Sequence, residues 1–451
     1  MPNKHSTGDL RRSLNLVIIS IAFGMVFFTV INGPALTAYT RLLGAGDLVY
    51  SIIMAMPVLG GVFQVIGSFL IEKTGKRKTL MIVSGFIHRL LWIPVALVPV
   101  FIPSSNHSMR ILLIAVLLMI SSIGNAFCGV AFSSWMGSLI PSEIRGRFFS
   151  KRTQIYTISS IITALIVGRI LDAYPSLNTF SIIFIIISII GAVDIICFIW
   201  VKHPQMNVEN SSINFLKLVK EPFANRNYMF FILFASVFSF GVNFAGPFFN
   251  VYMIEYLEME FFTISLYGQV IASLSTILFI KLWGRLIDLY GNKPVQKVCS
   301  TAIVILPVAW LLVTPETTFI ILIINFFGGL FWSGYELTLL NLSIWLAPEK
   351  NRSIYVAVFT LLTSVIGIAL AFICGGAVME YTKPLIQSLK LPFIMQPLNS
   401  FHILLILSAL VRLSSVIFIA PKFHESGSGT SYEVLKGFKT MVKQKFNVKI
   451  R

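Results

Sequence analysis

Twelve long apolar runs constrain the fold of this chain more than any other feature. Each holds 17 to 29 mostly apolar residues, and a helix needs about 20 residues to cross a hydrocarbon layer about 30 Å thick. Inside lipid, only helices and closed barrels satisfy their own backbone hydrogen bonds, and the runs lack the short alternating segments of a barrel. The sequence therefore predicts an all-α integral membrane protein with twelve transmembrane helices. The runs are 14–38, 48–71, 79–102, 111–139, 155–173, 178–200, 228–252, 262–280, 298–314, 318–346, 353–378 and 401–420.

Composition excludes the competing classes of protein. Only 12% of the 451 residues are charged, about half the share of a soluble domain. Apolar residues make up 56%, and disordered chains are not hydrophobic. The net charge of +17 would suit a nucleic-acid partner, but the charges fall between the apolar runs. We therefore expect the apolar runs to contact the lipid bilayer and the chain to bind no nucleic acid. We also expect the protein to be a monomer.

The distribution of positive charge predicts one orientation. Twelve spans place both termini on one side, and 28 of the 35 Lys and Arg lie on that side, in the tails and the even-numbered connections. Lys and Arg concentrate in cytoplasmic loops. We therefore expect both termini in the cytoplasm and a multi-pass protein of the plasma membrane. The residues on the opposite side are Arg41, Arg110, Lys383 and Lys390.

Three short landmarks occur twice in the same order, at offsets of 213, 216 and 207 residues. Each match is weak alone, but the shared order indicates two pseudo-symmetric six-helix bundles in parallel orientation, which is typical of secondary transporters. The landmarks are Gly33-Pro34 with Gly246-Pro247, residues 72–77 with 288–293, and residues 141–145 with 348–352. The expected domains are an N-terminal half over 1–200, a cytoplasmic connection over 201–227, a C-terminal half over 228–420 and a cytoplasmic tail over 421–451.

One of these landmarks resembles the signature of a known family. Residues 284–293 read Gly-Arg-Leu-Ile-Asp-Leu-Tyr-Gly-Asn-Lys, which resembles the loop Gly-x-Leu-x-Asp-x-x-Gly-x-Lys/Arg of the major facilitator superfamily. The first half carries a degenerate copy, with Ser68 at the leading position and Glu72 as the acid. Arg145-Gly146-Arg147 is similar to the loop that follows span four in the family. With the helix count and the duplication, the resemblance covers essentially the whole chain.

The resemblance implies a gate at the cytoplasmic ends of the helices. In the family, the acid of each loop meets the start of a helix in the other half, so Glu72 would lie near Arg352 and Asp288 near Arg147 or Arg152. A carboxylate there would stabilise the positive N-terminus of the helix that it meets. The alternative is that these charges only orient the spans. The candidate gate residues are Glu72, Gly75, Arg77, Arg145, Arg147, Asp288, Gly291, Lys293 and Arg352.

The resemblance also places a substrate path along the central helices of both halves. Polar side chains near the middle of those helices should face protein or water, because an amide in lipid costs several kcal/mol. Such residues also bridge helices without touching substrate, and both interpretations stay open. The candidates are Asn32, Gln64, Asn125, Asn243, Gln269, Trp332, Glu336, Thr360 and Thr363. Small residues, including Gly60, Gly61, Gly129, Gly328, Gly329 and Gly375, are expected to serve close helix packing.

Glu336 ranks first among these candidates, because it is the only carboxylate well inside a central helix. Such a group can take up and release a proton, as coupling to a proton gradient requires. It can also bind a cationic or hydroxyl-bearing substrate, or form a structural pair with another helix.

Other charges inside the spans suggest structural pairs. Arg169 and Asp172 are three residues apart and predict a local ion pair. Arg89 requires a carboxylate, and Asp194 is the nearest candidate in the same half. The apolar positions of the tail, from Val434 onward, recur near helical spacing opposite lysines, which predicts a basic amphipathic helix lying on the anionic leaflet.

The functional prediction is a secondary active transporter that moves a small organic solute by alternating access. Protons are a candidate coupling ion, and both uptake of a sugar or other metabolite and efflux stay open. The chain holds no His-Glu-x-x-His, Gly-x-Ser-x-Gly or phosphate-loop motif, so we expect no enzyme, no cofactor and no metal site. The alternative is a sensor or scaffold that has a transporter fold without transport. Substrate, direction, coupling ion and conformational state do not follow from the sequence.

Overall fold

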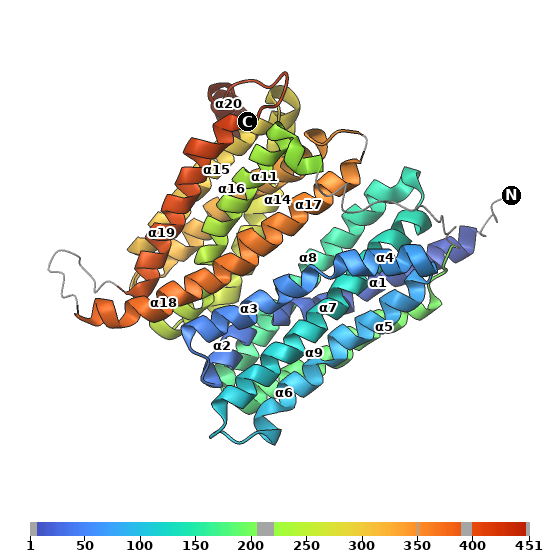
Figure 1. The fold of residues 1–451 in the computed structure, drawn as a ribbon, viewed down its shortest axis with the longest axis vertical. Helices are drawn as coiled ribbons and strands as arrows, with labels where there is room; N and C mark the ends of the chain where they lie inside the picture. The colour runs from blue at the N-terminus through green and yellow to red at the C-terminus, as the bar shows by residue number, and fades with distance from the viewer. Residues whose placement is uncertain (1–6, 205–220, 350, 389–398, 448–451) are drawn as a thin grey trace. The chain divides into compact units, whose positions relative to one another are not determined.

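The computed structural model describes residues 7–204, 221–349, 351–388 and 399–447, and the regular structure in these ranges is entirely helical (Figure 1). Within them, 12 helical segments are long and apolar enough to cross a membrane. Each overlaps one of the predicted runs, which confirms the prediction of an all-α membrane protein with twelve spans. Most of the predicted connection, residues 205–220, lies outside the described residues.

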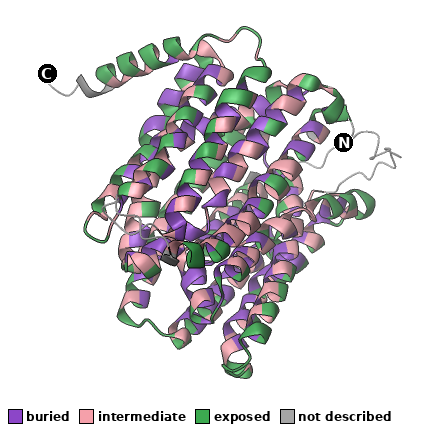
Figure 2. Ribbon diagram, turned by 60° about the vertical axis from the view of Figure 1, so that its left-hand side comes forward, coloured by how far each residue is buried: buried purple, intermediate pink, exposed green. Residues whose placement is uncertain are grey.

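The chain divides into two compact units, and burial follows the helix faces within each (Figure 2). Unit 1 comprises Met1–Ser212 and Met259–Leu266, and unit 2 comprises Ile213–Glu258 and Tyr267–Arg451. The helices of unit 1 are α1 (Thr7–Ile31), α2 (Pro34–Leu42), α3 (Asp47–Gly61), α4 (Gln64–Thr74), α5 (Arg77–Leu90), α6 (Trp92–Phe101), α7 (His107–Leu139), α8 (Ser142–Ala173), α9 (Leu177–Cys197) and α13 (Phe261–Ser265). Those of unit 2 are α11 (Arg226–Phe244), α12 (Phe248–Val251), α14 (Ala272–Tyr290), α15 (Asn292–Ala309), α16 (Phe319–Trp345), α17 (Arg352–Ser364), α18 (Ala371–Ser388), α19 (Ser400–Ser414) and α20 (Ser431–Asn447).

Helix boundaries differ from the apolar runs at a proline and where a helix begins with polar or charged residues. Helix α1 ends at Ile31 and α2 begins with Pro34, because proline lacks the N–H that would continue a helix and suits a first turn. Helix α8 begins at Ser142, 13 residues before the predicted run 155–173. Its first turns are polar and charged, so a criterion based on apolar residues cannot detect them.

A pair of buried tyrosines shows that the sequence repeat is also a repeat of contacts. The hydroxyl of Tyr39 donates to the carbonyl of Val95 at 2.8 Å, and that of Tyr252 donates to the carbonyl of Val313 at 3.1 Å. Each tyrosine follows its Gly-Pro landmark by the same spacing. A hydroxyl buried among apolar side chains needs a partner, and each unit supplies a backbone carbonyl, from Val95 within α6 and from Val313 just after the 3-10 turn Trp310–Leu312.

In the second landmark, a glycine with positive φ follows the helix in both units. Gly75 ends α4 with φ of 64°, and Gly291 ends α14 with φ of 88°. Glycine adopts positive φ at no steric cost, whereas other residues are strained there. Both positions therefore favour glycine for a conformational reason, independently of any role in a gate.

The predicted pair of Arg89 and Asp194 is confirmed. The guanidinium of Arg89 on α5 lies 2.8 Å from the carboxylate of Asp194 on α9, and their side chains are 4% and 9% exposed. The matching position in unit 2 carries the opposite charge. Gly24 and Gly241 are equivalent in the repeat, 217 positions apart. Gly24 lies against Asp194, whereas Gly241 lies against Arg412. Arg412 donates to the carbonyl of Ile303 at 3.2 Å.

The predicted local pair of Arg169 and Asp172 is wrong. The carboxylate of Asp172, at the end of α8, accepts from the backbone N–H groups of Phe261 at 2.6 Å and Phe262 at 3.0 Å. These amides begin α13, where the first N–H groups have no partner within the helix and attract negative charge. Arg169 lies over the ring of Phe262 at 4.0 Å. Two amides and an aromatic face thus replace the expected ion pair.

The tail forms the predicted helix, α20, but its apolar face packs on unit 2. Val434 is fully buried, and the ring of Phe438 stacks on Trp283 with centroids 5.1 Å apart. Helix α20 contacts both α14 and α15. The face that carries Val434 and Phe438 therefore packs on protein, which corrects the expectation that lipid covers it, while Leu435 is 54% exposed. Lys436 and Lys439 remain exposed.

We expect Asp194→Asn to destabilise the protein by roughly 3–5 kcal/mol, because it leaves a buried guanidinium without its counter-charge. Asp9→Asn is the matched control: it breaks the pair of Asp9 and Lys202, whose side chains are 46% and 44% exposed, and should cost less than about 1 kcal/mol. Thermal unfolding of the two variants in detergent measures the difference. Equal losses of stability in Asp194→Asn and Asp9→Asn would show that burial does not determine how much the pair of Arg89 and Asp194 stabilises the protein.

Candidate substrate cavity

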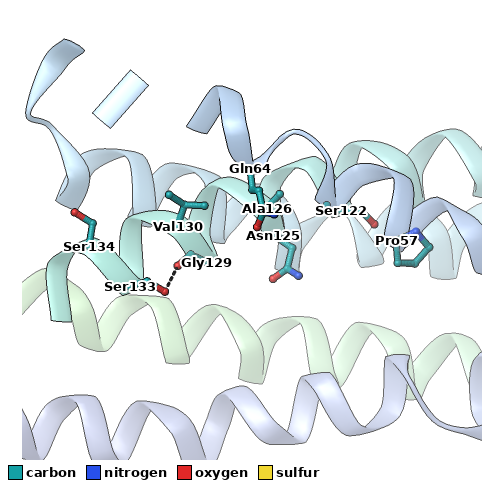
Figure 3. A pocket seen from close by; sticks show the side chains of 10 residues that line it. Pro57, Gln64, Ser122, Asn125, Ala126, Gly129, Val130, Ser133 and Ser134 are labelled. Carbon is teal, nitrogen blue, oxygen red and sulfur yellow. Dashed lines mark hydrogen bonds between the residues drawn. The ribbon is translucent and has the colours of Figure 1, made fainter. Parts of the chain in front are cut away.

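A cavity of about 500 Å³ lies in unit 1, where α3 and α4 face α7 (Figure 3). The cavity lies beside the break between α3, which ends at Gly61, and α4, which begins at Gln64. The break follows Pro57 and the Gly60-Gly61 pair, and prolines and glycines commonly bend helices. The lining residues are Pro57, Gly61, Gln64, Ser122, Asn125, Ala126, Gly129, Val130, Ser133 and Ser134. Volumes of 300–1,000 Å³ are typical of small-molecule sites.

Two amide side chains give this cavity its hydrogen-bonding capacity. Gln64 and Asn125 both line it, and neither side chain has a hydrogen-bond partner among the described residues. Each amide offers two donor hydrogens and a carbonyl oxygen. The structure thus brings together two of the predicted polar candidates and leaves their bonding groups free.

Serine residues that the sequence analysis missed complete the polar lining. Ser133 donates to the carbonyl of Gly129 at 2.9 Å, and Ser122 donates to that of Leu118 at 2.6 Å. A hydroxyl that donates to its own helix can still accept from a ligand. The signal that could have found this face is the spacing of Asn125, Gly129 and Ser133, because residues four apart lie on one side of a helix.

The glycines divide into two groups. A Cβ at Gly60 would lie 2.4 Å from the Cβ of Ser122, and one at Gly329 would lie 2.3 Å from the carbonyl oxygen of Ala272, so these positions require close packing, as predicted. A Cβ at Gly61 or Gly129 would meet no described atom within 4 Å. The expected packing role of Gly61 and Gly129 is therefore wrong, and both leave room in the cavity instead.

The other polar candidates are less available. Asn32 donates to the carbonyl of Phe28 at 2.9 Å, and Asn243 donates to that of Ser239 at 2.8 Å, so both amides bond to their own helix. Gln269 lies half-buried in the π-helical stretch Leu266–Ile271. The ring of Trp332 lies edge-on to Tyr335, 5.4 Å away on the same helix. These contacts leave the roles of the four residues as predictions.

Glu336 lies on an exposed face of α16 in unit 2. Within the described part of unit 2, it forms no hydrogen bond or ion pair. Its neighbour Tyr335 is buried and stacks on Phe238 with centroids 4.8 Å apart. The helix therefore buries its aromatic side and presents an unpaired carboxylate on the other side, beyond the middle of a membrane-spanning segment.

Several of the candidate gate residues bind the backbone of their own unit. The buried guanidinium of Arg77 donates to the carbonyls of Ser134 at 3.0 Å and Pro204 at 2.8 Å. Arg145 donates to the carbonyl of Gly137, near the end of α7, at 3.0 Å. Lys293 donates to the carbonyl of Phe423.

The remaining gate candidates are exposed. Within the described residues of their own units, none forms a hydrogen bond or an ion pair. Their proposed mutual contacts therefore stay a prediction. They are Glu72, Arg147, Asp288 and Arg352.

Comparison with known proteins decides the family. A sequence profile of the Major Facilitator Superfamily matches residues 16–372. The chain belongs to this superfamily. No curated protein sequence matches it significantly. Its family and fold are those of membrane transporters for small molecules.

Several solved structures share the fold of this chain at low sequence identity. The nucleoside transporter NupG is 13% identical with a TM-score of 0.70, covering 92% of this chain and 100% of its own. An inward-facing, occupied bacterial homologue of the human lysosomal transporter Spinster is 12% identical with a TM-score of 0.65, covering 97% and 98%. A D-xylose–proton symporter is 14% identical with a TM-score of 0.61, covering 94% and 98%.

The contact of Arg77 with His203 predicts a pH-dependent stability. Arg77 donates its Nε hydrogen to Nε2 of His203 at 3.2 Å, which requires an unprotonated Nε2. Burial, and then the charges of Arg77 and Lys78, lower the pKa of His203 from its ordinary value of 6.5. The unfolded state therefore binds a proton more readily, so this contribution to stability is present above about pH 6.5 and is lost as the pH falls.

We expect the melting temperature in detergent to fall less between pH 7.5 and pH 5 in His203→Gln than in the wild type. His424→Gln, which replaces an exposed histidine, is the control and should keep the wild-type profile. Identical profiles in all three proteins would contradict a role for His203.

Proposed function

We propose that this protein is a secondary active transporter that carries a neutral, hydroxyl-bearing organic solute by alternating access. The cavity of unit 1 carries this proposal, because its polar lining consists of uncharged amides and hydroxyls: Gln64, Asn125, Ser122, Ser133 and Ser134. Such groups bond hydroxyls well, whereas an anionic substrate would favour Arg or Lys in the cavity. Two proteins of the same fold have names that fit this class, a nucleoside transporter and a D-xylose–proton symporter.

Glu336 is the proposed coupling residue. An ionisable group within a membrane-spanning helix is functional by default, and no described residue of unit 2 pairs with this carboxylate. A structural ion pair within unit 2, the main alternative, therefore has no support among those residues. A carboxylate that alternates between protonated and ionised forms can link solute movement to a proton gradient.

The two carboxylates next to the glycine turns are the proposed gate. Glu72 and Asp288 occupy matched positions three residues before Gly75 and Gly291, and both are exposed. Exposed carboxylates can form charge-assisted hydrogen bonds with helix N-termini in one conformation and lose them in another. We place this gate at the cytoplasmic side of the plasma membrane, with both termini, because most Lys and Arg gather at that end.

The cavity proposal predicts that filling it blocks transport. Gly129→Leu places a side chain where no described atom lies within 4 Å of the new Cβ, so the helix should fold normally while solute is excluded. We expect uptake of radiolabelled uridine or D-xylose into proteoliposomes to fall at least tenfold relative to the wild type.

Gly137→Leu is the matched control for this experiment. Gly137 lies on the same helix, two turns further along, does not line the cavity, and also has no described atom within 4 Å of a Cβ. Its transport rate should equal that of the wild type. Equal rates in Gly129→Leu and the wild type would overturn the cavity assignment. Failure of the wild type to transport any nucleoside or sugar would favour a different solute or a transport-inactive sensor.

Glu336→Gln preserves the shape of the side chain and removes its titration. If Glu336 couples protons, this variant should lose accumulation driven by a pH gradient but keep exchange of labelled for unlabelled solute. Glu316→Gln, an exposed acid before α16, should retain both activities. Loss of exchange as well would assign Glu336 to substrate binding, and wild-type accumulation would exclude both roles.

A further inference from the structure

A second cavity, of about 210 Å³, lies at one end of unit 2 and is lined in part by Lys293, one of the candidate gate residues. It is enclosed by α11, the first turns of α15 and the segment that follows α19. Its lining combines aromatic and basic side chains: Phe234, Lys293, Gln296, Lys297, Pro421 and Phe423. An enclosed space with convergent polar groups is the usual form of a ligand site.

The amide of Gln296 indicates that this cavity has a ligand. Gln296 is only 1% exposed, and both its Nε2 and its Oε1 are buried without a hydrogen-bond partner in the described chain. A buried, unpaired amide costs about 1–3 kcal/mol, and native proteins leave few such groups. A ligand with both an acceptor and a donor would satisfy the two atoms together.

Two lysines give the cavity its charge. Lys293 and Lys297 lie four residues apart, on one face of α15, where like charges repel. Lys293 uses one of its three hydrogens on the carbonyl of Phe423, and Lys297 is exposed at the edge. A carboxylate close to Lys293, that of Glu425, accepts from Asn292 and from the backbone N–H of Lys293, both at 2.7 Å. An anion between the two ammonium groups would relieve their repulsion.

We propose that this cavity binds a phosphate group that carries a neighbouring hydroxyl, as in a glycerol phosphate headgroup. The phosphate oxygens would accept from Lys293, Lys297 and Nε2 of Gln296, and the hydroxyl would donate to Oε1 of Gln296. This arrangement pairs each unsatisfied atom with a group of complementary type.

The position of the cavity fits an anionic membrane lipid. Its residues lie at the ends of two membrane-spanning segments, Asn292–Leu312 and Ser400–Lys422, which is the depth of lipid headgroups. By the orientation that the Lys and Arg distribution predicts, this end meets the cytoplasmic leaflet, where anionic lipids bind basic pockets between helices. A soluble phosphate ester offers the same chemistry, and the experiment separates the two sources.

The test uses the purified full chain, stripped of lipid in detergent. It is titrated with phosphatidylglycerol, with phosphatidylcholine of the same chain length, and with glycerol 3-phosphate. Melting temperature and native mass spectrometry report binding. We expect phosphatidylglycerol to raise the melting temperature and to remain bound at one molecule per chain, and phosphatidylcholine to do neither.

Two variants assign the binding to this cavity. Gln296→Leu and Lys297→Gln should each weaken it at least tenfold. Lys439→Gln, which removes an exposed charge from α20, should bind as the wild type does. Without lipid, Gln296→Leu should melt no lower than the wild type, because it removes two unsatisfied atoms. Lys297→Gln changes an exposed side chain, so it still tests the proposal if Gln296→Leu misfolds.

The titrations also identify the source of the phosphate. Binding of phosphatidylglycerol that glycerol 3-phosphate does not displace supports a membrane lipid. Displacement, or binding of glycerol 3-phosphate alone, supports the same site with a soluble ester as its ligand. Equal binding of phosphatidylglycerol and phosphatidylcholine, or wild-type binding by both Gln296→Leu and Lys297→Gln, would overturn the proposal.

Discussion

In hydrocarbon, no water is present to form hydrogen bonds with a polar group, so the protein must supply the partner itself. This constraint determines the structure of both units. The backbone meets it by forming helices. Buried side chains meet it one by one: Tyr39 and Tyr252 bond to carbonyls, and Arg89 pairs with Asp194. Three amides that line cavities are informative for the same reason. Gln64, Asn125 and Gln296 have no hydrogen-bond partner among the described residues, and a bound molecule can supply one there.

The same constraint explains which features the sequence could predict. Spans were predictable because crossing lipid requires a long apolar run, and the Arg89 pair was predictable because a buried cation requires an acid and Asp194 was the nearest in its half. Asp172 was misassigned, since its partners are amides 89 and 90 positions away and any residue supplies an amide. Gly129 and Gly60 look alike in sequence, and only the neighbouring helix decides whether a glycine is packed or leaves a space.

The two units share a plan but not a charge distribution. The tyrosine anchors and glycine turns recur, so the duplicated parts are those that define the backbone. Where unit 1 holds Asp194 opposite Arg89, unit 2 holds Arg412 against the carbonyl of Ile303. Unit 1 holds the cavity whose amides, Gln64 and Asn125, have no hydrogen-bond partner among the described residues, and unit 2 holds Glu336, whose carboxylate has none there either. A common scaffold has thus acquired different chemistry in each copy.

The contact of Asp172 with α13 determines which positions of this contact can tolerate substitution during evolution. Its carboxylate bonds to backbone N–H groups, which every residue except proline provides. Positions 261 and 262 can therefore exchange side chains over generations without losing these two hydrogen bonds, although Arg169 favours a ring at Phe262. Position 172 has no such freedom, because few side chains can accept two hydrogen bonds at once. The contact therefore constrains the residue type at position 172 much more strongly than at positions 261 and 262.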